Sequence, residues 1–132
     1  MSNGTLSLFP KVFDASSLLS IEKAKRMPAL RARRDEVVFP EKVAAEVGGR
    51  ESPLRRFIKK HPGAVVTLTA HEEETFLELL REPDIDEGEA AAIAVAVRRG
   101  YPLVIDDGRA RKRAVRLGVK CLGWRDFVDG RA

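Results

Sequence analysis

The sequence is poor in cysteine and histidine. Its 132 residues contain one cysteine, Cys121, and two histidines, His61 and His71. A single cysteine excludes an intrachain disulfide, and three soft ligands nearly exclude a structural zinc site, which normally takes four. The histidines also argue against a Ser-His-Asp or Cys-His catalytic set, because neither lies near a nucleophile-elbow motif. Any metal in this chain must therefore be held by oxygen.

Long apolar runs are lacking as well. The longest nearly apolar run, Ala90 to Val97, is far shorter than the roughly 20 residues of a membrane-spanning helix. No basic segment followed by an apolar one opens the chain. Together with the lone cysteine, these absences predict a cytoplasmic protein with no membrane partner. Aromatic residues make up 6% of the chain, so a sheet that stacks several RNA bases is not expected.

Charged residues, by contrast, are plentiful. They make up 33% of the chain beside 44% hydrophobic residues, with a net charge of +4. This composition is that of a folded domain, and the small positive excess favours an anionic partner without identifying it. No repeat and no Gly/Ser/Pro-rich linker divides the chain. We therefore expect a loose N-terminal lead-in at residues 1–10 and a single domain at residues 11–132.

Short apolar runs alternate with segments of helical periodicity. Strands are predicted at residues 11–13, 36–39, 64–68, 103–105 and 119–122, and helices at 16–25, after Pro28, after Pro40, and at 52–60, 72–81, 87–99 and 109–117. This alternation predicts an α/β fold, a three-layer α/β/α sandwich around a mainly parallel sheet of about four or five strands. The nearly all-apolar middle of the helix at 87–99 indicates burial on most sides. Glu72 to Glu74 are expected to be solvated.

Acidic side chains stand at four places where solvated acids are uncommon. Asp14 ends the first strand, Glu46 borders the buried face of its helix, Glu89 opens the most apolar helix, and Asp106 and Asp107 end an apolar strand. Taken singly, each has an ordinary explanation, such as a helix cap, the helix dipole, the rim of an amphipathic face or a strand-end turn. Only their convergence would favour a site.

Convergence follows from the geometry of a parallel sheet. Neighbouring strand ends lie about 5 Å apart, and ligands collect at the carboxyl ends of the strands. Asp14 and the pair Asp106 and Asp107 therefore meet if their strands are neighbours. Grouped carboxylates repel one another or take up protons unless a divalent cation neutralises them. Oxygen ligands suit Mg²⁺ or Mn²⁺, and two such ions about 4 Å apart can activate water against a phosphodiester.

Four motifs together resemble the PIN-domain family, whose members include the toxins of bacterial and archaeal toxin-antitoxin pairs. The motifs are F-D-A-S-S-L-L at residues 13–19, V-A-A-E-V at 43–47, D-E-G-E-A-A-A-I-A-V-A at 86–96 and L-V-I-D-D-G-R-A-R at 103–111. The resemblance covers roughly residues 11–123. It implies a metal-dependent endoribonuclease that hydrolyses RNA, with Mg²⁺ or Mn²⁺ as cofactor, and suggests the toxin of a type II pair with a cognate antitoxin protein as partner. Family members usually pair, so a homodimer is expected. They also usually continue past the position of Gly123 with one or two more helices, so the C-terminus of this domain is expected to be short.

The resemblance also assigns residues. It implies that Asp14, Glu46, Glu89 and Asp107 are catalytic, and that these four and Asp106 are metal-binding. The family spacing falls on Asp107, whereas the double-Asp motif equally allows Asp106, so both stay open. Ser16, Arg109 and Arg111 are expected to bind the substrate, Ser16 as the family's small hydroxyl and the two arginines as phosphate contacts beside the acids.

Two other functions use the same features. A PIN-like module without catalysis would bind RNA or protein through this surface, although the presence of every motif acid favours the nuclease. A response-regulator-like phosphoacceptor also uses acids at strand ends. It would need a lysine at the end of the last strand, and Lys120 stands at the start of that strand instead.

Overall fold

The fold is described from a computed structural model, in which residues 9–47, 51–106 and 108–131 are placed. A five-stranded sheet in the order β3-β2-β1-β4-β5 forms its centre, and every strand pair is parallel. The strands are Lys11–Phe13 (β1), Val37–Pro40 (β2), Val65–Val66 (β3), Leu103–Val104 (β4) and Cys121–Leu122 (β5). The predicted α/β fold with a mainly parallel sheet is confirmed, although most strands are shorter than the apolar runs that predicted them.

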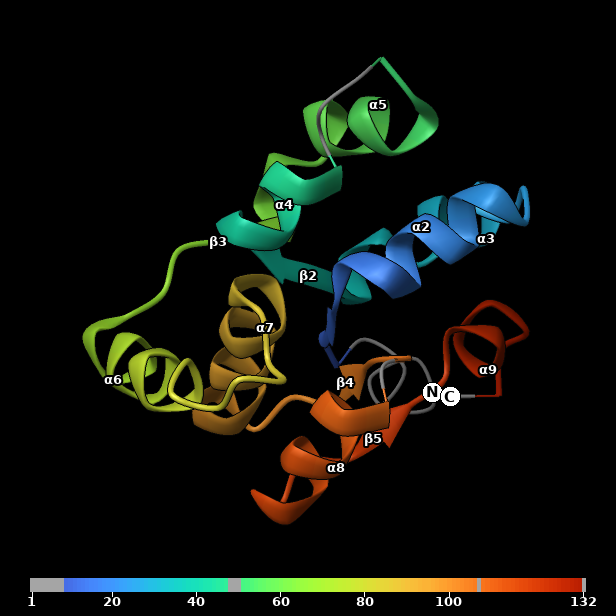
Figure 1. Cartoon of the computed structure of the whole chain (residues 1–132). Helices are drawn as coiled ribbons and strands as arrows, with labels where there is room; N and C mark the ends of the chain where they lie inside the picture. Colours follow the sequence, from blue (N-terminus) through green and yellow to red (C-terminus); the bar gives the residue numbers. More distant parts are fainter. Residues whose placement is uncertain (1–8, 48–50, 107, 132) are drawn as a thin grey trace.

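Helices connect the strands and cover both faces of the sheet. They are α2 (Ala15–Lys23), α3 (Met27–Ala32), α4 (Glu41–Val47), α5 (Pro53–Lys60), α6 (Ala70–Leu79), α7 (Glu87–Arg99), α8 (Gly108–Arg116) and α9 (Trp124–Val128), with 3-10 turns at Arg34–Glu36 (η1) and Pro62–Ala64 (η2). In Figure 1, α6 and α7 lie on one side of the sheet, and α2, α3 and α9 lie on the other. This is the predicted three-layer arrangement. None of the described helices combines the length and apolar composition needed to cross a membrane.

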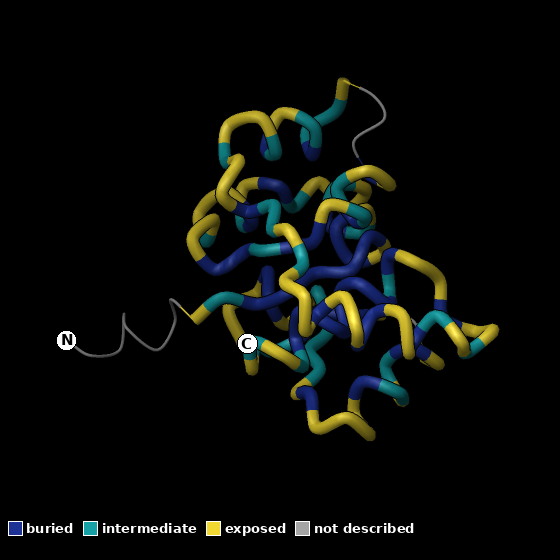
Figure 2. The backbone as a smooth tube through the Cα atoms, turned by 90° about the vertical axis from the view of Figure 1, so that its left-hand side faces the viewer, coloured by how far each residue is buried: buried dark blue, intermediate teal, exposed yellow. Residues whose placement is uncertain are grey.

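Helix α7 is the most deeply packed helix, as its sequence predicts. Asp86 caps its N-terminus, and Gly100 ends it in the left-handed conformation, with φ at 72°. Every residue from Ala90 to Ala96 is at most 1% exposed. The small alanine side chains let α7 lie against β1 and β2. In Figure 2, the buried backbone lies mainly in the centre of the molecule.

Two buried carboxylates of this fold are neutralised by cations. Lys11 Nζ donates to Glu36 Oε1 at 2.8 Å, and the Arg33 guanidinium binds both oxygens of the same carboxylate. Burial acts to raise the pKa of Glu36, but the hydrogen bonds and charges of Arg33 and Lys11 outweigh it and lower that pKa. These contacts join β1 to η1 and hold the carboxylate in its charged form.

Glu72 is the second such carboxylate, and its predicted solvation is wrong. The residue is 1% exposed, because its side chain turns back to accept the Thr69 N–H at 2.8 Å in a capping box. Arg99, at the end of α7, donates to both Glu72 oxygens at 2.6 and 3.1 Å. Burial acts to raise the pKa of Glu72, but Arg99 and the Thr69 backbone lower it. The ion pair between Glu72 and Arg99 links α6 to α7.

Sheet register brings the predicted acids to one edge of the sheet. Phe13 of β1 is paired with Val104 of β4, and the Asp14 N–H donates to the Val104 carbonyl at 3.1 Å. Asp14 and Asp106 therefore leave neighbouring strands at the same end. Strand β2 lies on the other side of β1 and leads into α4, which packs against α7.

Candidate active site

Asp14 is the most buried acid at the carboxyl edge of the sheet, with 1% of its surface exposed. It follows β1 directly and caps α2, because its Oδ1 accepts the Ser17 N–H at 2.8 Å. Its second oxygen, Oδ2, is buried and has no hydrogen-bond partner among the described residues. An unpartnered buried oxygen is unfavourable. Among the described residues, therefore, only one of the two carboxylate oxygens of Asp14 has a hydrogen-bond partner.

The pKa of Asp14 reflects this environment. Burial raises it above the usual value, and the charge of Asp106 raises it further. Hydrogen bonds from Ser17 act in the opposite direction, and the Asp106 backbone lowers it more weakly. The Asp106 N–H lies near enough to affect the carboxylate, yet no hydrogen bond of ordinary geometry reaches Oδ2. The charged form of the Asp14 carboxyl group is therefore less favourable here than in water.

A small pocket gathers acids from three elements. Its volume is about 20 Å³, enough for roughly one water molecule or ion. The end of β1 and the start of α2 contribute Asp14, Ala15 and Ser16, helix α4 contributes Glu46, and the start of α7 with its cap contributes Asp86, Gly88 and Glu89. Three of the predicted acids, Asp14, Glu46 and Glu89, therefore share one pocket in this structure.

Glu46 reaches the pocket from α4 while part of its side chain stays exposed. Its pKa is raised, first by burial and then by the charges of Asp86, Asp14 and Glu87. Among the described residues, Glu46 itself forms no salt bridge, whereas Lys42 lies 3.8 Å from Glu87. The charges that raise the pKa of Glu46 are all negative, an arrangement that favours cation binding or proton uptake.

Glu89 and Asp86 form the capping box of α7. The Glu89 N–H donates to Asp86 Oδ1 at 2.8 Å, and the Asp86 N–H donates to Glu89 Oε1 at 3.0 Å. These bonds fix both carboxylates at the rim of the pocket. Asp86 is the pocket acid that sequence reasoning missed. Its signal was the D-x-x-E spacing before an apolar run, which is typical of a capping box.

Two substitutions separate the cap of α7 from the charge of Asp86. We expect Asp86→Ala to lower the free energy of unfolding by about 1 kcal/mol, the usual loss for a removed N-cap. Asp86→Asn keeps a capping oxygen, so its free energy of unfolding should stay within roughly 0.5 kcal/mol of wild type. Urea denaturation of the three proteins measures both values. An equal loss in the two variants would show that the charge of Asp86, not its cap, stabilises α7.

The fourth predicted acidic position is only partly described. Asp106 follows β4, is exposed, and acts on Asp14 through its charge and backbone. Asp107 lies outside the described residues, so the choice between the two stays open. Among residues 9–47, 51–106 and 108–131, no three histidine, cysteine, aspartate or glutamate side chains form a metal-binding group. The acids share a pocket and repel one another, but in the described structure their oxygens are not arranged as the ligands of one metal ion.

Of the three predicted substrate contacts, the two arginines have protein partners in this structure. Ser16 is exposed at the pocket wall. Arg109 forms an ion pair with Asp84 at 2.6 Å, and Arg111 donates to the carbonyl oxygens of Ile105 at 3.2 Å and Cys121 at 3.4 Å. Arg111 therefore links α8 to the residue that follows β4 and to the first residue of β5. The binding of substrate by Ser16, Arg109 and Arg111 stays a prediction.

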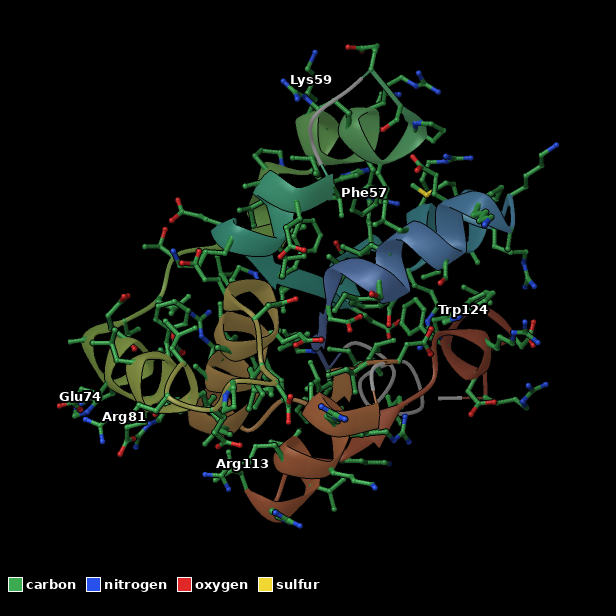
Figure 3. The ribbon with its side chains drawn as sticks, in the orientation of Figure 1. Phe57, Lys59, Glu74, Arg81, Arg113 and Trp124 are labelled. Atoms are coloured by element: carbon green, nitrogen blue, oxygen red, sulfur yellow. The ribbon has the colours of Figure 1, made fainter. Side chains whose placement is uncertain are left out.

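Helix α8 is also joined to the loop that leads into α7. Figure 3 shows Arg113 on the side of α8 that faces the end of α6, where its Nε donates to Glu82 Oε2 at 2.5 Å. With the pair of Arg109 and Asp84, this gives two ion pairs between α8 and residues 80–86. These ion pairs link the loop before α7, which contains the N-cap Asp86, to α8.

The comparison with models of protein families agrees with this arrangement. No curated protein matches the chain in sequence. A family model of the PIN domain matches residues 10–124, a span that holds all five strands and every described acid of the pocket. The match covers far more than half of the chain, and it confirms the resemblance drawn from the four motifs. The chain belongs to the PIN-domain family.

Proposed function

We propose that the chain is a Mg²⁺- or Mn²⁺-dependent endoribonuclease that hydrolyses RNA phosphodiester bonds. The supporting observation is a contrast among its buried carboxylates. Glu36 and Glu72 are each bound by lysine or arginine, whereas Asp14 is equally buried and has one oxygen without a partner in the described structure. A fold that neutralises two buried acids with cations leaves the third open toward a pocket lined by further acids.

The pocket suits a hard divalent cation. Its donors are carboxylate oxygens, the ligand type that Mg²⁺ and Mn²⁺ prefer, and Asp14, Glu46 and Glu89 would hold the ion together with Asp106 or Asp107. When bound, such an ion supplies an activated water and stabilises the leaving oxygen of the phosphodiester. The chain contributes a preformed acid at Asp14, fixed by β1 and α2, and a second at Glu89, fixed by the capping box.

Residues beside the pocket would bind the RNA backbone. The ion pair between Arg109 and Asp84 is exposed on both sides, 72% and 54%, and exposed pairs are worth little. Arg109 can therefore exchange this carboxylate for a phosphate as RNA enters. Ser16 offers a hydroxyl at the pocket wall, and we assign it to the same backbone contact. We assign Arg111, which also donates to the carbonyl oxygens of Ile105 and Cys121, to the phosphate contact as well.

Family membership supports the biological part of the proposal. We propose that the chain is the toxin of a type II toxin-antitoxin pair, acts in the cytoplasm as a homodimer, and is held inactive by a cognate antitoxin protein. The positive net charge of +4 fits both an RNA substrate and an acidic inhibitory segment. Co-expression with the product of the adjacent gene tests this part, since a cognate antitoxin would relieve growth arrest caused by the chain alone.

The nuclease itself is tested with purified protein and end-labelled RNA. We expect cleavage of a single-stranded RNA with Mn²⁺ or Mg²⁺, no cleavage with EDTA, and no cleavage of DNA of the same sequence. The main alternative, a binding module without catalysis, predicts a gel shift of intact RNA at every metal concentration. Cleavage that persists unchanged in EDTA would contradict the metal-dependent mechanism.

A further inference from the structure

Gly88 occupies an unusual place among the glycines of the chain. It is buried in the first turn of α7, between Asp86 and Glu89. The point where a Cβ of residue 88 would stand is already taken by Oε1 of Glu46, with Glu46 Cδ at 3.0 Å and Asp86 Oδ1 at 3.6 Å. At every other described glycine, that point has no such atom within 4 Å. The missing side chain of Gly88 is thus filled by a carboxylate from another helix.

Backbone geometry does not explain a glycine at this position. Gly88 is absent from the described glycines with positive φ, which are Gly100, Gly118 and Gly130, so its conformation is open to any residue. Glycine also weakens a helix compared with alanine, and α7 has three consecutive alanines at residues 90–92, directly after Glu89. The sequence therefore uses the poorer helix former at the one position where a methyl group would meet Glu46.

Helices α4 and α7 pack against each other, and two features of α4 lie near this point. Lys42 of α4 lies 3.8 Å from Glu87 of α7, one turn before Glu46. Val43, on the same helix, is fully buried. Because the packing of the two helices fixes their separation, an added methyl group at residue 88 is most readily accommodated by movement of the flexible Glu46 side chain.

We propose that Gly88 is a positioning residue of the active site, whose missing Cβ lets the Glu46 carboxylate enter the acid pocket beside Asp14 and Glu89. This inference rests on the proposed function, in which Glu46 holds a divalent cation. Gly88 acts through Glu46 alone and touches neither metal nor RNA. A methyl group at residue 88 displaces the Glu46 carboxylate from the pocket and leaves the fold intact.

A double-mutant cycle tests this coupling. Wild type, Gly88→Ala, Glu46→Ala and the double variant are compared by Mn²⁺ affinity, measured with electron paramagnetic resonance, and by RNA cleavage. In the wild-type background, Gly88→Ala should weaken Mn²⁺ binding and cleavage by about tenfold, toward the level of Glu46→Ala. In the Glu46→Ala background the same change should have less than about a twofold effect, because the group that it displaces is already gone.

Stability and a matched glycine supply the controls. Alanine is the better helix former, so the Tm of Gly88→Ala should equal or exceed that of wild type. Gly63→Ala, at a glycine with no atom within 4 Å of the added Cβ, should leave Mn²⁺ affinity and cleavage unchanged. A tenfold loss caused by Gly88→Ala in both backgrounds would overturn the inference, since it would indicate a role in helix packing independent of Glu46.

A crystal structure of metal-free Gly88→Ala separates this inference from the proposed function. We expect the Glu46 carboxylate to turn away from the first turn of α7, whether or not the wild type binds Mn²⁺. A carboxylate that stays in place while α7 shifts would overturn the positioning role. If Glu46→Ala binds Mn²⁺ as tightly as wild type, the metal-binding role of Glu46 fails, and the role of Gly88 in the site fails with it. If Glu46→Ala weakens binding and Gly88→Ala does not, only the inference fails.

Discussion

Asp14→Asn is expected to abolish RNA cleavage without weakening the metal-free fold. Removing this carboxylate takes away the one buried acid of the pocket, and we expect a loss of at least roughly 10³-fold, which corresponds to about 4 kcal/mol of transition-state stabilisation. The fold should survive because asparagine is an equally good N-cap, so the Ser17 N–H keeps an acceptor. A neutral amide also removes the unfavourable burial of a charge. The Tm in EDTA should therefore equal or exceed that of wild type.

Initial cleavage rates and thermal unfolding of the same preparations measure both effects. Asp35→Asn is the matched control, because it makes the same chemical change at an exposed acid outside the pocket, and it should leave both quantities unchanged. The opposite behaviour of activity and stability is the informative result. If Asp14→Asn retained cleavage within tenfold of wild type, the proposed catalytic role of this carboxylate would be contradicted.

The order of elements and the meeting of the acids were predictable for physical reasons. Apolar residues recur with one period in strands and another in helices, which makes the order of elements predictable. A parallel sheet also places the carboxyl ends of all its strands at one edge. Asp14 and Asp106 therefore had to come close once β1 and β4 were neighbours, which the pairing of Phe13 with Val104 establishes. The sequence pattern alone did not establish that pairing. The family resemblance implied that the acids act together, and the structure supplies the pairing of the two strands.

Contacts between helices were beyond the reach of the sequence pattern. The filling of the space at Gly88 by Glu46 depends on the distance between α4 and α7, which no local period encodes. The burial of Glu72 also went unrecognised, because three consecutive glutamates favour a solvated interpretation. A closer look at spacing would have helped in that case. Thr69 and Glu72 have the T-x-x-E spacing of a capping box, which turns the glutamate back toward the helix start and toward Arg99.

Ion binding should appear as a gain in stability at neutral pH. A ligand that binds only the folded state at a hundred times its Kd adds about 2.7 kcal/mol, roughly 8 °C in Tm for a domain of this size. We therefore expect Mn²⁺ to raise the Tm of wild type by this amount relative to EDTA at pH 7.5. The gain should be lost in Asp14→Asn and reduced in Glu46→Ala. Differential scanning calorimetry with saturating Mn²⁺ measures it.

The pH dependence of that gain follows from the raised pKa values of Asp14 and Glu46. An acid with a raised pKa in the folded state contributes stability below its unfolded pKa, near 4, and loses that contribution as the pH rises through the folded value. Without metal, these two groups therefore favour folding in acid and oppose it at neutral pH. Glu36 and Glu72 have lowered pKa values and act in the opposite sense, so the metal-free profile alone does not isolate the pocket.

The difference between the profiles with Mn²⁺ and with EDTA does isolate the pocket. Bound ligands must be deprotonated, so the Mn²⁺ gain should be small near pH 4 and should grow as Asp14 and Glu46 lose their protons. Glu36 and Glu72 are already bound by lysine or arginine, so they contribute equally with and without the ion and cancel from the difference. A Mn²⁺ gain that is constant from pH 4 to pH 8, or one that survives in Asp14→Asn, would place the ion elsewhere on the protein.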